Sequence, residues 1–97
     1  MIKHTKTKIV ATIGPACDSP EILKEMMLAG MNVARLNLSH GSIAQHTQRI
    51  YMLRKVASDI GGNIAIMVDT KGIEIRTGSL RDGSVVLEPE SIFTLYA

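Results

Sequence analysis

The sequence has few of the residues that mark disulfide-bonded, metal-binding, membrane or nucleic-acid-binding proteins. Cys17 is its single cysteine, which excludes an internal disulfide and a paired-cysteine zinc or redox site. The longest apolar run, Ile64 to Val68, is far too short to span a membrane. Trp is absent, only three other aromatic residues occur, and 11 Lys and Arg are interspersed with nine Asp and Glu. We therefore expect a cytoplasmic protein that binds neither a membrane nor nucleic acid.

The composition is that of a folded domain. Hydrophobic residues make up 45% of the 97 residues and charged residues 21%, close to the average for soluble globular chains. This balance is far from the low hydropathy and high charge of disordered segments. A packed core is therefore expected.

Hydrophobic periodicity predicts strands that alternate with helices. A β-branched run, a strictly alternating segment and a short apolar run are typical of strands, and they cover residues 9–13, 32–39 and 64–68. Two segments with helical spacing follow Ser19 and Ser42 and end at Gly30 and Gly61. The second predicted helix presents an apolar face formed by Ile43, His46, Ile50, Leu53, Ala57 and Ile60. This order predicts an α/β fold of three parallel strands joined by two right-handed crossovers.

The sequence pattern changes after Asp69. Short β-type segments occur at residues 73–75, 85–87 and 92–95, separated by turn-forming residues around Gly83 and Pro89. We expect antiparallel strands here and the start of a second domain.

The second predicted strand has a polar face. A strand in a parallel sheet covered by helices should be apolar on both sides, yet Arg35, Asn37 and Ser39 alternate with its apolar residues. One explanation is an edge strand with a solvated face. The other is a functional site at the carboxyl ends of the strands, which Asp69 and Thr70 at the end of the next strand favour.

The side chains of this cluster suit small ions. One carboxylate together with amide and hydroxyl oxygens suits a cation of low charge, while Arg35 beside them suits an anion such as phosphate. The helix that begins after His40, Gly41 and Ser42 could add backbone N–H groups for an anion, although Ser42 as an ordinary helix cap explains the same residues. Glu74 and Arg76 favour a simple ion pair.

Three motifs resemble the amino-terminal part of pyruvate kinase. They are residues 7–16 (TKIVATIGPA), 30–41 (GMNVARLNLSHG) and 69–78 (DTKGIEIRTG), in that order. The resemblance implies that residues 1–72 are the first part of a catalytic (β/α)₈ TIM barrel, a fold of roughly 250 residues when complete. It also implies that residues 73–97 are the exit strand and the beginning of a small β lid domain.

The same resemblance implies roles for individual residues. Arg35 matches the catalytic arginine that contacts the phosphoryl group of phosphoenolpyruvate. The potassium ligands are matched by Asn37, Ser39, Asp69 and Thr70, and the nucleotide-facing positions by Asn37, Leu38, Ser39, His40 and Arg76. The implied reaction is phosphoryl transfer between phosphoenolpyruvate and ADP, giving pyruvate and ATP in glycolysis, in an enzyme that is commonly a homo-oligomer.

The chain departs from the family pattern in two ways. Ile73 stands where the family usually has proline, so the exit toward the lid loses a fixed φ angle. The family's catalytic lysine and its Mg²⁺-binding carboxylates are expected beyond residue 97, and the isolated chain is accordingly expected to be inactive. The alternative is a non-catalytic half-barrel module that binds phosphate-type anions or assembles with a partner.

Overall fold

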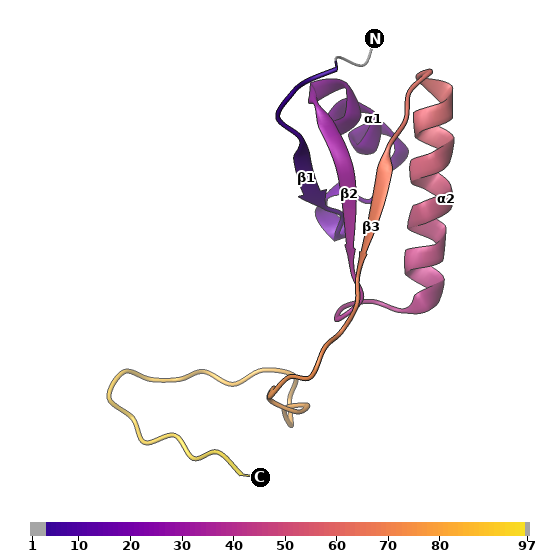
Figure 1. The fold of residues 1–97 in the computed structure, drawn as a ribbon. Coiled ribbons are helices and arrows are strands. Elements are labelled where there is room, and N and C mark those ends of the chain that lie inside the picture. The colour runs from indigo at the N-terminus through magenta and orange to yellow at the C-terminus, as the bar shows by residue number, and fades with distance from the viewer. Residues whose placement is uncertain (1–3, 97) are drawn as a thin grey trace.

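The computed structural model describes residues 4–96 of the chain, and its elements alternate as the sequence predicts (Figure 1). In order they are β1 (Ile9–Thr12), the short 3₁₀ helix η1 (Pro15–Cys17), α1 (Pro20–Ala29), β2 (Met31–Asn37), α2 (Ile43–Asp59) and β3 (Ala65–Asp69). The strands are parallel and form one sheet in the order β1-β2-β3. Because β2 lies between the other two strands, the edge-strand explanation for its polar face is wrong.

Local sequence signals set both helices. The hydroxyl oxygen of Ser19 accepts a hydrogen bond from the backbone N–H of Ile22 at the start of α1, and Pro20 occupies the first turn. The helix stops at Gly30, whose φ of +123° is unfavourable for residues with a side chain. At the start of α2, Ser42 and Gln45 exchange hydrogen bonds between side chain and backbone, which is a capping box.

Both helices pack on the same face of the sheet, which carries the core. The buried hydrophobic residues are Ile13, Leu23, Met27, Met31, Ala34, Leu36, Leu53, Val56 and Ala57. The predicted apolar face of α2 is confirmed for His46, Leu53 and Ala57, which are buried, and is wrong for Ile43, which is 74% exposed. Ile43 is the first residue of the helix and lies beyond the core, whereas Arg49 and Val56 complete the buried face.

The opposite face of the sheet is open among the described residues. Val10 and Met67 are about half exposed there, at 48% and 44%. Arg35 and Asn37 of the central strand also lie on this face and are partly exposed. The open face and the carboxyl ends of the strands therefore present the polar residues that the sequence singled out.

The antiparallel strands expected after residue 72 are not formed. Within the described part of the chain, residues 70–96 contain turns but no helix or strand, and they extend away from the sheet (Figure 1). The apolar residues Ile73, Ile75 and Ile92 are almost fully exposed. A β segment is stable only when another strand satisfies its backbone hydrogen bonds and a core covers its apolar face, and neither is present here.

None of the helices in residues 4–96 has both the length and the apolar character that a membrane span requires.

Candidate functional site at the carboxyl ends of the strands

Strand register brings Arg35, Asn37 and Asp69 to the carboxyl ends of neighbouring strands. Thr12 of β1 pairs with Arg35 of β2, and Asn37 of β2 pairs with Asp69 of β3. The backbone N–H of Leu38 donates to the carbonyl oxygen of Asp69 at 3.0 Å, which extends the β2–β3 pairing past the end of β2. Parallel strands lie about 4.8 Å apart, so side chains from all three strands can meet here.

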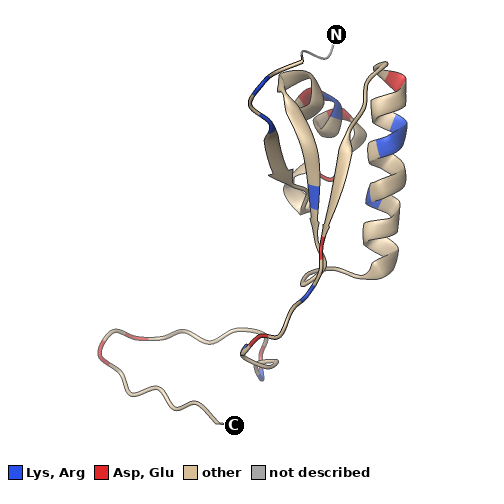
Figure 2. Ribbon diagram, viewed as in Figure 1, with Lys and Arg blue, Asp and Glu red and all other residues tan. Residues whose placement is uncertain are grey.

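Arg35 is the centre of this cluster. Its Nε donates to Oδ2 of Asp69 at 3.1 Å, its Nη2 forms an ion pair with the same oxygen, and its Nη1 donates to the hydroxyl oxygen of Thr12 at 2.8 Å. In Figure 2 the basic segment of β2 and the acidic end of β3 lie on neighbouring strands. The guanidinium group therefore bridges β1, β2 and β3.

The Arg35–Asp69 pair is open to solvent and therefore weak. The side chains are 30% and 43% exposed. Ion pairs with this degree of exposure contribute only about 0–1 kcal/mol to stability, because water screens the charges. An anion that offers two oxygens to Arg35 and a cation that approaches Asp69 can replace the pair at little cost. The geometry suits a site that binds a negative and a positive group side by side.

Asn37, Ser39 and Asp69 supply the oxygens that a monovalent cation prefers. The side-chain oxygen of Asn37 accepts a hydrogen bond from the backbone N–H of Ser39 at 3.0 Å, which turns the chain at the end of β2. That oxygen keeps a second lone pair, and the carboxylate of Asp69 lies on the paired position of β3. Thr70 follows Asp69 directly and is exposed. This hard oxygen set with one negative charge fits potassium chemically. Among residues 4–96, no cluster of three or more His, Cys, Asp or Glu side chains is arranged to hold a metal ion.

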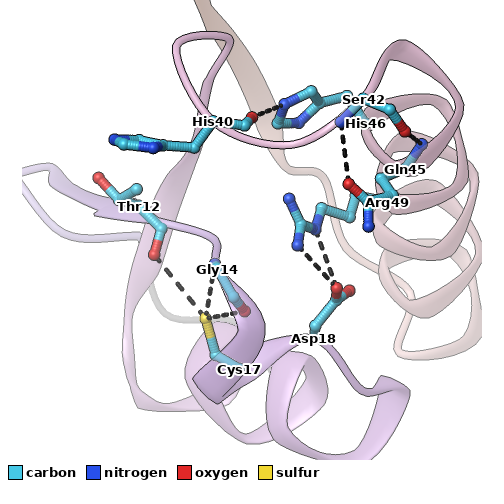
Figure 3. A network of polar contacts seen from close by, with 9 residues as sticks. All are labelled: Thr12, Gly14, Cys17, Asp18, His40, Ser42, Gln45, His46 and Arg49. Atoms are coloured by element: carbon cyan, nitrogen blue, oxygen red, sulfur yellow. Dashed lines mark hydrogen bonds and ion pairs between the residues drawn. The ribbon is translucent and has the colours of Figure 1, made fainter. Parts of the chain in front are cut away.

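The loop between β2 and α2 forms one wall of a hollow beside this cluster. The hollow has a volume of about 410 Å³ and is lined by Thr12, Ile13, Gly14, Pro15, Asn37, His40, Gly41, Gln45 and Arg49. Figure 3 shows the His40 ring turned toward Thr12, while the His40 carbonyl points the other way toward His46. The predicted nucleotide-facing residue His40 thus lines a cavity that adjoins Arg35's partner Thr12.

Arg76 is not brought to this cluster. It lies in the extended segment after β3, where its Nη2 donates to Oε2 of Glu74 at 2.7 Å, so the expected ion pair forms without a strand. The hydrogen bond from Arg76 holds the pKa of Glu74 below its ordinary value, and the charges of Arg76 and Lys71 act in the same direction. Within residues 4–96, no hydrogen bond or ion pair links Arg76 to β2 or β3.

Sequence reasoning missed three features of the site. The first is Thr12, the last residue of β1, which lies two positions before Gly14; a hydroxyl residue that close to a Gly-Pro turn is a signal of a strand end. Asp18 and Arg49 form an ion pair at 2.9 Å that links α2 to the start of α1, with the Arg49 side chain only 10% exposed. No local pattern relates residues 31 positions apart. The hydrogen bond between His46 and the His40 carbonyl is the third feature.

Comparison with known proteins identifies relatives over most of the chain. The family "Pyruvate kinase, barrel domain" matches residues 4–95. The pyruvate kinase of Staphylococcus haemolyticus is 59% identical over 83 residues, which cover 86% of this chain and 14% of that protein. The pyruvate kinase of Staphylococcus saprophyticus is 54% identical over 90 residues, covering 93% of this chain and 15% of the relative.

A solved structure agrees with these relatives. The crystal structure of Cryptosporidium parvum pyruvate kinase superimposes with a TM-score of 0.77 at 45% sequence identity, over 81% of this chain and 16% of that one. The chain thus covers only 14% of the length of the first of these curated relatives, about one-seventh. The expected α/β barrel architecture is confirmed for its first strands and helices. The chain belongs to the pyruvate kinase family and corresponds to part of its barrel domain.

Proposed function

We propose that the chain serves as the amino-terminal part of a pyruvate kinase, an enzyme that transfers a phosphoryl group between phosphoenolpyruvate and ADP. The observation that carries the proposal is the position of Arg35, which presents a planar guanidinium group at the carboxyl end of β2 with weakly held partners on both neighbouring strands. Family membership supports this function over the alternative of a non-catalytic half-barrel module.

Arg35 binds the phosphoryl group in this proposal. Its fork of N–H donors matches two oxygens of a phosphoryl group, as it now matches one oxygen of Asp69 and the hydroxyl of Thr12. Phosphoryl transfer depends on positioning and on neutralising charge that spreads over the transferred oxygens. When the phosphoryl group arrives, Arg35 exchanges its bond to Asp69 for the substrate, and Asp69 is released toward a cation.

Asn37, Ser39, Asp69 and Thr70 hold potassium in the same proposal. When bound there, potassium would supply a positive charge beside the transferred group, and the carboxylate of Asp69 would be balanced by it when Arg35 turns to the substrate. Support comes from the adjacent positions of Asn37 and Asp69 on paired strands and from the hard character of the four donor side chains. Magnesium, which the reaction also requires, would be held by residues outside this segment.

The nucleotide approaches from the side of residues 37–40, where Asn37, Leu38, Ser39 and His40 follow one another at the end of β2. His40 lines the hollow described above, which supports an approach from this direction. We propose that residues 73–97 begin the β lid domain and that Arg76 reaches the nucleotide once those residues have strand partners. A homo-oligomer in the cytoplasm is the state proposed for the whole enzyme.

A hybrid enzyme tests the proposed function. The segment is fused in place of the matching residues of the Staphylococcus haemolyticus pyruvate kinase, which is 59% identical over 83 of them. We expect the hybrid to convert phosphoenolpyruvate and ADP to pyruvate with a turnover within tenfold of that relative, and to require potassium. A folded hybrid without turnover, compared with the intact relative in the same assay, would contradict the proposal.

A further inference from the structure

A buried histidine, His46, lies outside the predicted site. His46 lies on α2 with 5% of its surface exposed, and its Nε2 lies 2.6 Å from the carbonyl oxygen of His40. A carbonyl oxygen only accepts hydrogen bonds, so Nε2 carries the proton and donates it. The other ring nitrogen, Nδ1, is buried and has no hydrogen-bond partner among the described residues.

The unpartnered Nδ1 argues against a purely structural role for His46. A buried polar atom without a partner lowers the stability of the fold, and an apolar side chain at this position would avoid that loss. The hydrogen bond from Nε2 offsets only part of that loss. Stability alone would thus favour a leucine of similar size. A leucine could not donate a hydrogen bond to the His40 carbonyl, whereas His46 does so and thereby fixes the orientation of that carbonyl.

The loop around this carbonyl is built for close contact with α2. Gly41 has a φ of +77°, and a Cβ there would lie 3.3 Å from Nε2 of His46 and 3.0 Å from Oε1 of Gln45. That Gln45 oxygen accepts the hydrogen bond from the N–H of Ser42 in the capping box. The contact between the loop and α2 therefore depends on a bare glycine and a histidine donor together.

The same contact sets the direction of the His40 side chain. Because the carbonyl points to His46, the ring extends to the opposite side, toward Thr12 and the hollow (Figure 3). On the other side of the loop, the N–H groups of Ser39 and His40 donate to the side-chain and backbone oxygens of Asn37 at 3.0 and 3.3 Å. The loop is thus held at both ends.

We propose that His46 is a positioning residue for nucleotide binding: it holds the His40 carbonyl so that residues 38–40 face the nucleotide. This inference rests on the proposed function, which places ADP at residues 37–40. His46 lines neither the hollow nor the Arg35 cluster. It should therefore affect the KM for ADP and leave the KM for phosphoenolpyruvate, which Arg35 binds, unchanged.

Two amide variants at position 46 distinguish the effect of the hydrogen-bond donor's position from the effect of side-chain size. In His46→Gln the side-chain amide nitrogen replaces Nε2, whereas in His46→Asn it takes the place of Nδ1 and falls short of the carbonyl. In the hybrid enzyme we expect His46→Asn to raise the KM for ADP at least fivefold and His46→Gln to stay within twofold. An unchanged KM for ADP in folded His46→Asn, or equal rises for both substrates, would overturn the proposal.

Gly41→Ala perturbs the same contact from the loop side, in case His46→Asn does not fold. Gly41 is exposed, so the fold should survive, and we expect the same selective rise in the KM for ADP. If the KM for ADP in Gly41→Ala stays within twofold, the proposal is wrong.

Amide exchange of the 97-residue chain supplies a readout independent of turnover. The Ser39 and His40 amides should exchange at least fivefold faster in His46→Asn than in His46→Gln. Equal exchange rates would overturn the role of His46 even with an active hybrid. An inactive hybrid with the expected exchange pattern would instead contradict the proposed function.

Discussion

The replacement of Arg35 by lysine tests whether the guanidinium fork, rather than its charge, stabilises the transferred phosphoryl group. Lysine keeps the positive charge, so the attraction of a unit charge at about 4 Å, on the order of 4 kcal/mol at an effective dielectric of 20, is largely retained. What is lost is the planar geometry that now makes hydrogen bonds from Nε, Nη1 and Nη2 to partners on two strands.

The expected size of the effect follows from the bonds lost. Hydrogen bonds from a charged donor contribute about 1.5–3 kcal/mol each, and lysine loses one or two of them in the transition state. We expect a loss of about 3–4 kcal/mol, which lowers kcat of the hybrid enzyme by roughly two to three orders of magnitude. The KM for ADP should change much less, because ADP approaches from residues 37–40.

Stability does not confound this experiment. The Arg35–Asp69 pair is partly exposed, so its contribution to folding is at most about 1 kcal/mol and the variant should stay folded. Arg54 on α2 is an exposed arginine, and Arg54→Lys is the matched control with unchanged kcat. Steady-state kinetics with each substrate varied, together with thermal unfolding, give both quantities. If folded Arg35→Lys turns over within threefold of the parent, the role assigned to Arg35 is wrong.

Three further predictions concern the cation, the core and a charge pair. Asp69→Asn removes the carboxylate charge at similar size and should abolish potassium stimulation of the hybrid; stimulation that persists would contradict the assignment. Leu53→Ala leaves a cavity at a fully buried position and should lower the free energy of unfolding, measured by urea denaturation, by about 2–5 kcal/mol. Tyr51 is 69% exposed, so Tyr51→Ala should lower it far less. Equal losses for the two variants would show that Leu53 is not packed in the core. The hydrogen bond from Arg76 is the main cause of the lowered pKa of Glu74, so the ion pair is lost as the pH falls through that lowered pKa. In Arg76→Gln, an NMR titration of the Glu74 carboxyl should give a higher pKa. An unchanged pKa would count against the contact.

Much of the fold could be predicted because local patterns coincide with tertiary structure in residues 9–69. Ser19 and Gly30 bound α1 as expected, and the alternation around Leu36 correctly separated the buried face of β2 from its polar face. In residues 73–96 the local pattern alone was insufficient. Ile73 and Ile75 have strand propensity, yet strands depend on pairing partners that their own sequence does not supply.

The site was predictable where it follows from strand alternation, and unpredictable where it follows from contacts between distant residues. Alternation placed Arg35 and Asn37 on one face, and strand order brought Asp69 beside them. The sequence assigned Arg35 to an anion and Asp69 to a cation; that the two side chains bind each other depends on their rotamers. The partnership of His46 with a backbone carbonyl is invisible in sequence, since a histidine on a helix face carries no sign of its partner.

In the proposed reaction, Arg35 and Asp69 separate, and each binds a group of opposite charge. A crystal structure of the hybrid enzyme with phosphoenolpyruvate and thallous ion, an anomalous scatterer that replaces potassium, tests this separation most directly. We predict Arg35 on the phosphoryl oxygens and an anomalous peak among the oxygens of Asn37, Ser39, Asp69 and Thr70. An intact Arg35–Asp69 pair in the presence of both ligands, with the anomalous peak elsewhere, would show that the two side chains do not separate to bind them.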